Sequence, residues 1–95
     1  MVSVELVIRN PSGLHARPAS LFSESAGRFA ARITVENLDR AGARPVDAKS
    51  ILLLLTAGVQ RGNRIRLSAD GPDEADAIRT LSKLIEDGLG ETAEG

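Results

Sequence analysis

Residues 2–18 read VSVELVIRNPSGLHARP, and the change of pattern within this stretch decides the fold. In its first half, apolar positions recur at every second residue, which predicts a strand with one buried face. Four turn-forming residues at 10–13 then interrupt that pattern. Pro18 is compatible with a helix only in its first turn, so we expect a helix that begins close to His15. The stretch therefore predicts a strand, a turn and a helix.

The rest of the chain predicts three more strands and two more helices. The apolar run 51–55 fits a buried strand or one short helix, and Ser50 as a possible N-cap with Gly58 as a possible terminator favours the helix. The other elements follow from alternation or helical spacing of apolar residues. They are strands over 31–36, around 46 and over 64–69, a first helix ending near 27, and a last helix over about 73–85.

This order is strand, helix, strand, strand, helix, strand, helix. Four mainly antiparallel strands with helices covering one face form an economical small α+β domain. We expect one domain over residues 1–89 and a frayed tail over 90–95. The segment 37–45 contains Gly42 and Pro45 and is expected to form an extended loop.

The composition argues against several classes of function. The chain has 95 residues, with 12 basic against 13 acidic side chains and a net charge of −1. Such a balance does not favour binding to nucleic acid or to an anionic membrane by bulk attraction. Tyrosine and tryptophan are absent, so aromatic platforms for stacking bases are lacking. We therefore expect no nucleic-acid partner.

The absence of cysteine excludes disulfides and thiolate chemistry and fits a cytoplasmic location. No basic segment followed by an apolar stretch marks a secretory signal at the N-terminus. The longest purely apolar run, 51–55, is too short to span a bilayer. A single histidine without cysteine makes a transition-metal site improbable, and we expect neither a metal nor a cofactor.

His15 is the only histidine and the most chemically pointed residue. At the start of a helix, the backbone N–H groups of Ala16 and Arg17 lack intrahelical partners and attract an anion. Arg17 adds a forked guanidinium suited to phosphate oxygens. Two other interpretations remain open: an ordinary loop histidine, and a hydrolase in which His15 acts as base for Ser12 or Ser20. No second catalytic group is identifiable nearby, which favours a phosphoryl carrier over an enzyme.

Two motifs carry a resemblance to a known family. Residues 13–19, GLHARPA, resemble the phosphorylation site of HPr, the histidine-containing phosphocarrier of the phosphoenolpyruvate-dependent sugar phosphotransferase system. Residues 48–51, AKSI, resemble the regulatory serine motif of the same family, and the likeness covers nearly the whole chain. Two motifs in the right order are far more specific than either alone. The resemblance implies an open-faced β-sandwich, with four antiparallel strands and three helices on one side.

The resemblance also implies roles for individual residues. His15 would take a phosphoryl at Nδ1 from phosphorylated enzyme I and pass it to a histidine of an enzyme IIA domain. Ala16 and Arg17, with Ser12 in the same loop, would hold the phosphate. Ser50 would be phosphorylated by HPr kinase in bacteria that possess this enzyme, and would then engage a catabolite-control transcription regulator.

Partners must reach His15, so a docking surface is expected around it, on a chain that we expect to be monomeric. Five consecutive apolar residues in a short helix cannot all face inward, because successive positions turn by about 100°. The expected docking residues are Ser20, Leu21, Glu24, Lys49, Leu52, Leu53 and Leu55. Two alternatives stay open: a regulatory module acting through Ser50, and a carrier in a nitrogen-type or dihydroxyacetone-kinase relay.

Overall fold

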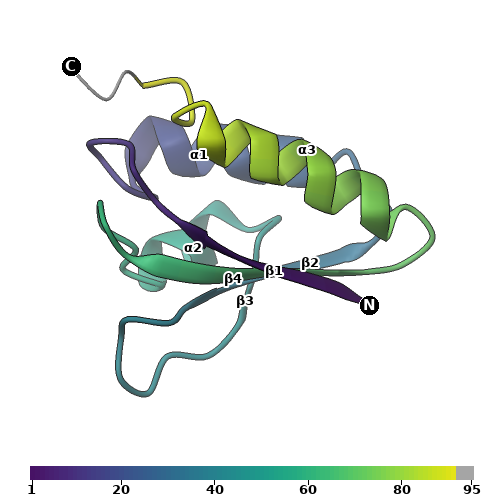
Figure 1. Ribbon diagram of the computed structural model, residues 1–95, viewed down its shortest axis with the longest axis horizontal. Coiled ribbons are helices and arrows are strands. Elements are labelled where there is room, and N and C mark those ends of the chain that lie inside the picture. Colours follow the sequence, from purple (N-terminus) through teal and green to yellow (C-terminus); the bar gives the residue numbers. More distant parts are fainter. Residues whose placement is uncertain (92–95) are drawn as a thin grey trace.

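The computed structural model describes residues 1–91, which form four strands and three helices in the order βαββαβα (Figure 1). The elements are β1 (Val2–Val7), α1 (Ala16–Ala26), β2 (Arg32–Asn37), β3 (Val46–Asp47), α2 (Ile51–Thr56), β4 (Arg64–Asp70) and α3 (Glu74–Glu86). Each element that the sequence predicts is present, with strand ends displaced by about one residue.

The strands form one antiparallel sheet in the order β1-β4-β2-β3. Leu67 of β4 lies opposite Val4 of β1 on one side and Val35 of β2 on the other. Figure 1 shows α1 and α3 lying across one face of this sheet. The fold is the open four-stranded antiparallel sheet with three helices that the sequence predicts.

The core lies between the sheet and its helices. The inward positions of β4, Ile65, Leu67 and Ala69, are fully buried, as the alternation of this strand requires. Phe22 from α1 and Leu81 from α3 are fully buried above them. Burying one such side chain contributes roughly 1.5–3 kcal/mol, so a thin core can hold both helices on the sheet.

Ser50 is the N-cap of α2, as predicted: its hydroxyl accepts a hydrogen bond from the backbone N–H of Leu53 at 3.2 Å. Of the five apolar residues 51–55, only Leu54 is buried. One turn and a half of helix offers a single inward position, because its neighbours rotate away from the core. The prediction that the run leaves apolar side chains exposed is confirmed.

Candidate functional site

His15 is the N-cap residue of α1 and has an extended backbone (φ −125°, ψ 156°). Its side chain is half-buried, and no side-chain hydrogen bond caps the helix. The N–H groups of the first turn, those of Ala16 and Arg17, therefore have no side-chain acceptor. The imidazole lies at the positive end of the helix, where an anion is stabilised.

Ala16 has a left-handed backbone conformation, with φ of +49°. For a residue with a Cβ atom this conformation costs roughly 1–2 kcal/mol. Ala16 lies between His15 and Arg17, so its left-handed conformation turns the chain sharply between these two residues. No sequence signal predicts this geometry, because the usual left-handed residues are glycine and asparagine.

Arg17 is exposed, and no carboxylate of residues 1–91 forms an ion pair with it. Its planar fork of N–H donors can therefore bind an incoming oxyanion without first breaking a salt bridge. This arrangement suits transient binding, since an anion that arrives on a partner has no internal carboxylate to displace from Arg17.

The loop before His15 is fixed against the segment that follows α2. Leu14 is fully buried, and its N–H donates to the carbonyl of Val59 at 3.0 Å. Gly13 has φ of +61°, and a Cβ atom there would overlap the Val59 carbonyl and lie 2.9 Å from Cα of Gln60. Position 13 therefore requires glycine for its conformation and for its close approach. The backbone that presents His15 is consequently held by tertiary contacts.

Glu91 adds a contact that sequence reasoning missed. Its carboxylate accepts hydrogen bonds from the side-chain amide of Asn10 at 2.9 Å, from the N–H of Ser12 at 3.0 Å and from the Ser12 hydroxyl at 2.8 Å. The hydrogen bonds from Asn10 and Ser12 lower the pKa of the Glu91 carboxyl. The Glu91 side chain is therefore hydrogen-bonded to the loop before His15. Of the tail predicted over 90–95, residues 92–95 lie outside the described residues.

Three leucines of α2 have exposed side chains. Leu52 is 74% exposed, and Leu53 and Leu55 are also exposed. The N-terminal end of α2 is joined to α1 by a hydrogen bond from the Ser23 hydroxyl to the Lys49 carbonyl, at 2.9 Å. The segment after its C-terminal end holds the loop before His15, as described above. The structure therefore brings the predicted leucines of α2 to the flank of α1.

The other predicted docking residues lie on α1 and just before α2. Ser20 and Glu24 are exposed on α1, and Leu21 is half-buried. The Glu24 carboxylate pairs with Arg28 at 3.4 Å, one helical turn away. The Lys49 ammonium donates to the carbonyl of Phe29 at 2.7 Å, so Lys49 bridges the chain after α1 to the start of α2.

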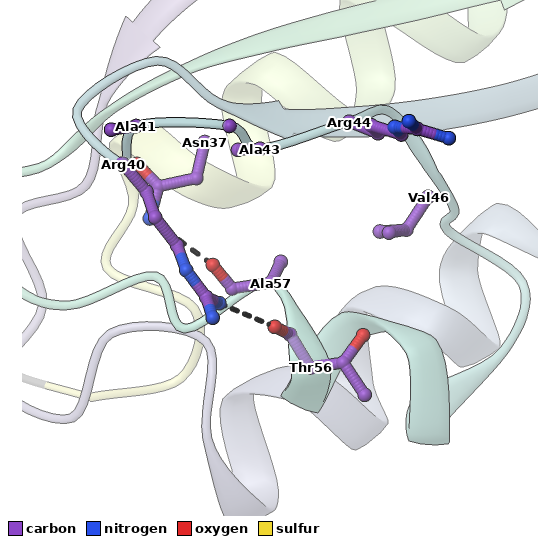
Figure 2. A pocket seen from close by; sticks show the side chains of 9 residues that line it. Asn37, Arg40, Ala41, Ala43, Arg44, Val46, Thr56 and Ala57 are labelled. Carbon is purple, nitrogen blue, oxygen red and sulfur yellow. Dashed lines mark hydrogen bonds between the residues drawn. The ribbon is translucent and has the colours of Figure 1, made fainter.

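The extended loop 38–45 borders a surface cavity of about 270 Å³ at the C-terminal end of α2 (Figure 2). The Arg40 guanidinium donates to the carbonyl of Thr56 at 2.7 Å, which satisfies one of the free carbonyls at that helix end. The buried Asn37 side chain donates to the Ala57 carbonyl at 3.2 Å. This cavity is lined by none of residues 12–17, so the loop supports α2 rather than the imidazole.

Within residues 1–91, no group of three or more His, Cys, Asp or Glu side chains could hold a metal ion. None of the helices in that part of the chain is long and apolar enough to cross a bilayer. The chemistry available around His15 is therefore one imidazole, one guanidinium, backbone N–H groups and a serine hydroxyl.

Comparison with known proteins links this site to a described family. Residues 2–87 match the family model described as the PTS HPr component phosphorylation site. The chain is 39% identical over 93 residues to a multiphosphoryl transfer protein of Salmonella typhimurium. That match covers 98% of this chain but 24% of the relative, so the chain spans about a quarter of the length of this curated relative.

Two solved structures share the fold over nearly their full lengths. HPr-C-His from Thermoanaerobacter tengcongensis superimposes with a TM-score of 0.89 and 44% identity, covering 97% of this chain and 99% of that chain. A phosphocarrier protein HPr from Bacillus anthracis str. Ames gives a TM-score of 0.81 and 31% identity, covering 88% and 95% of the two chains.

Proposed function

The chain belongs to the HPr family of the phosphotransferase system, and from this premise we propose that it is a phosphocarrier. It accepts a phosphoryl group on His15 from phosphorylated enzyme I and passes it to a histidine of an enzyme IIA component. One observation carries the proposal: in a chain matched over residues 2–87, the only histidine occupies the N-cap position of α1, beside an Arg17 that forms no ion pair within residues 1–91.

The transfer exchanges one phosphorus–nitrogen bond for another. A neutral imidazole nitrogen of His15, Nδ1 by family resemblance, attacks the phosphorus of the donor phosphohistidine. The bond from phosphorus to the donor nitrogen breaks, and its electron pair stays on the donor imidazole. The donor ring takes up one proton from solvent, and the phosphorylated His15 ring releases one, so both rings end neutral. The reverse geometry serves the second transfer, in which His15 is the leaving group. A single nucleophile thus suffices, and we propose a carrier rather than an enzyme.

The residues around His15 stabilise the charge of the transferred group. The Arg17 guanidinium and the N–H groups of Ala16 and Arg17 supply donors at the positive end of α1. These groups are positioned before the partner arrives, so little reorganisation accompanies the transfer. His15 is half-buried, so its imidazole is partly accessible to a partner histidine.

Docking is assigned to the exposed side chains of α2 together with α1. Leu52, Leu53 and Leu55 expose apolar side chains on α2, and the segment that follows this helix holds the loop that presents His15. Apolar residues that are exposed together favour a protein partner. Ser20, Leu21, Glu24 and Lys49 supply the surrounding rim. A monomer in the cytoplasm, free to present this surface to enzyme I and then to enzyme IIA, fits a shuttle.

Ser50 provides a second, regulatory candidate function. Its hydroxyl caps α2, and its side chain is half-buried next to the apolar surface. A phosphoryl group there would add a charge of about −1.5 to −2 beside the leucines and hinder docking of enzyme I. HPr kinase and a catabolite-control regulator would be the partners in this case, and a nitrogen-type or dihydroxyacetone-kinase relay would use His15 with other donors.

Incubation with phosphoenolpyruvate and enzyme I, followed by intact mass measurement, tests the carrier role. We expect the mass of one phosphoryl group, lost on acid treatment. His15→Ala should abolish the gain, whereas the matched variant Ser50→Ala should retain it. An unchanged mass of the wild-type chain, or a phosphorylated His15→Ala variant, would refute the proposal.

A further inference from the structure

The carboxylate of Glu91 occupies hydrogen-bond donors that lie in the same loop as His15. Ser12 precedes His15 by three residues, and both its N–H and its hydroxyl point to Glu91, at 3.0 and 2.8 Å. These are the kinds of donor that bind a phosphate oxygen. In this state of the molecule Ser12 is therefore engaged by an internal anion.

The segment that carries Glu91 is folded for this contact. Gly88, Leu89 and Gly90 all have positive φ, of 91°, 52° and 80°, so the chain reverses sharply after α3. Leu89 is fully buried, and its N–H donates to the carbonyl of Leu84 at 3.0 Å. The Glu91 N–H donates to the Gly88 carbonyl at 2.9 Å. In Figure 1 the yellow end of the described chain returns to the purple loop that precedes α1.

Asn10 connects this contact to the loop backbone. Its side chain is buried, and its amide nitrogen donates both to the Gly13 carbonyl at 2.8 Å and to Glu91 at 2.9 Å. The amide oxygen is buried without a partner among the described residues. The opposite orientation of the amide would set its oxygen against two acceptors, so the two hydrogen bonds fix the orientation. Glu91 is thus held by both ends of residues 10–12.

Resting on the proposed function, we propose that Glu91 is a placeholder anion: its carboxylate holds the Ser12 donors while His15 is unphosphorylated, and a phosphoryl group on His15 displaces it. A phosphohistidine carries about two negative charges, which repel a carboxylate bound in the same loop. The Ser12 donors then exchange one anion for the other, with no covalent change beyond the phosphoryl transfer itself. Glu91 is accordingly a positioning residue that acts through Ser12 and Asn10.

The exchange couples the C-terminal segment to His15: the segment is attached through Glu91 when His15 is unphosphorylated and released when His15 is phosphorylated. Because coupling between two sites is reciprocal, phosphorylation that releases Glu91 must be favoured by whatever weakens the Glu91 contact. Typical coupling between sites corresponds to a factor of about 5–150. We therefore expect the N–H groups of Leu89 and Glu91 to exchange with solvent at least about fivefold faster once His15 is phosphorylated.

Amide hydrogen exchange by NMR measures this directly. Potassium phosphoramidate, a small-molecule phosphoryl donor, is used to phosphorylate His15, so the test does not depend on enzyme I; intact mass and a His15→Ala sample verify the modification. We expect faster exchange at Leu89 and Glu91 and a shifted Ser12 amide resonance, while amides in the middle of α3 remain unchanged. Unaltered exchange at Leu89 and Glu91 with His15 phosphorylated would overturn the proposal without touching the carrier role.

A pair of variants tests whether the charge of the phosphoryl group on His15 displaces Glu91, or whether the Glu91 contact is only structural. Glu91→Gln removes the repelled charge, and Glu86→Gln removes an equal charge from an exposed position on α3. We expect phosphorylation to accelerate exchange at Leu89 at least about fivefold in the Glu86→Gln variant, as in the wild type, and less than about twofold in Glu91→Gln. The same acceleration in all three chains would refute the assignment of Glu91.

Discussion

Replacing Leu54 of α2 with alanine removes a fully buried side chain, whereas the same change at Leu52 trims one that is 74% exposed. Loss of a buried leucine side chain costs about 3 kcal/mol, combining lost transfer free energy with the cavity left behind. For a domain of this size that is a fall in Tm of roughly 12–24 °C. The Leu52→Ala change also removes three carbons, each worth about 0.8 kcal/mol when fully buried. Because only about a quarter of the Leu52 side chain is buried, we expect this variant to lose about 0.6 kcal/mol of stability.

The two variants should therefore fail in different assays. Leu54→Ala should unfold at a much lower temperature, as measured by far-ultraviolet circular dichroism. At temperatures where this variant is folded, enzyme I should have the same KM for it as for the wild-type chain. Leu52→Ala should keep a near-wild-type Tm. It should raise the KM of enzyme I for this chain by about tenfold, as expected when an apolar side chain in the docking contact is truncated. A Leu52→Ala variant that transfers with an unchanged KM would refute the docking assignment of α2. A loss of more than about 2 kcal/mol in that variant would refute the placement of its side chain.

Three further predictions concern the loop, the cap and the acid limb of stability. Gly13→Ala should lower the free energy of unfolding by more than about 1 kcal/mol in urea titration, because the new methyl meets the Val59 carbonyl at a left-handed φ; an unchanged midpoint would contradict this geometry. Ser50→Ala should cost about 1 kcal/mol by loss of the α2 cap, and Ser50→Asp should keep the fold but slow phosphoryl acceptance at His15; transfer by Ser50→Asp at the wild-type rate would count against regulation there. Hydrogen bonds from backbone N–H groups, that of Ala30 foremost, lower the pKa of the Asp73 carboxyl in the folded state. The contribution of Asp73 to folding stability is therefore fully present above its unfolded pKa of about 3.9 and is lost as the pH falls through the lower folded value. Asp73→Asn should therefore flatten the fall of Tm below about pH 4, and a variant with the wild-type acid profile would exclude this carboxylate as a cause.

Local pattern was sufficient for the strands and helices and for their order along the chain. Alternation identified β4, and the turn at 10–13 followed by Pro18 placed the start of α1 at His15 to within one residue. Ser50 was recognised as a cap because capping depends on residues three positions apart. The short run 51–55 was resolved as a helix by its flanking residues, although its periodicity alone was ambiguous.

Contacts between distant segments were beyond the reach of the sequence. Glu91 meets Ser12 across 79 positions, and the sequence suggested only a frayed end, because exposed glycine-rich termini are commonly disordered. A signal did exist, since Gly88 and Gly90 flank Leu89 and permit a sharp reversal. Arg40 similarly explains the extended loop 38–45, but only once its guanidinium is seen on the Thr56 carbonyl.

The sequence by itself determined which segments are strands and helices, and that the only imidazole stands at the head of α1. The tertiary structure alone decided the left-handed backbone at Ala16, the single inward leucine of α2 and the anion that holds Ser12. The physical reason is that periodicity and capping act over a few residues, whereas these features depend on which surfaces the folded chain brings into contact.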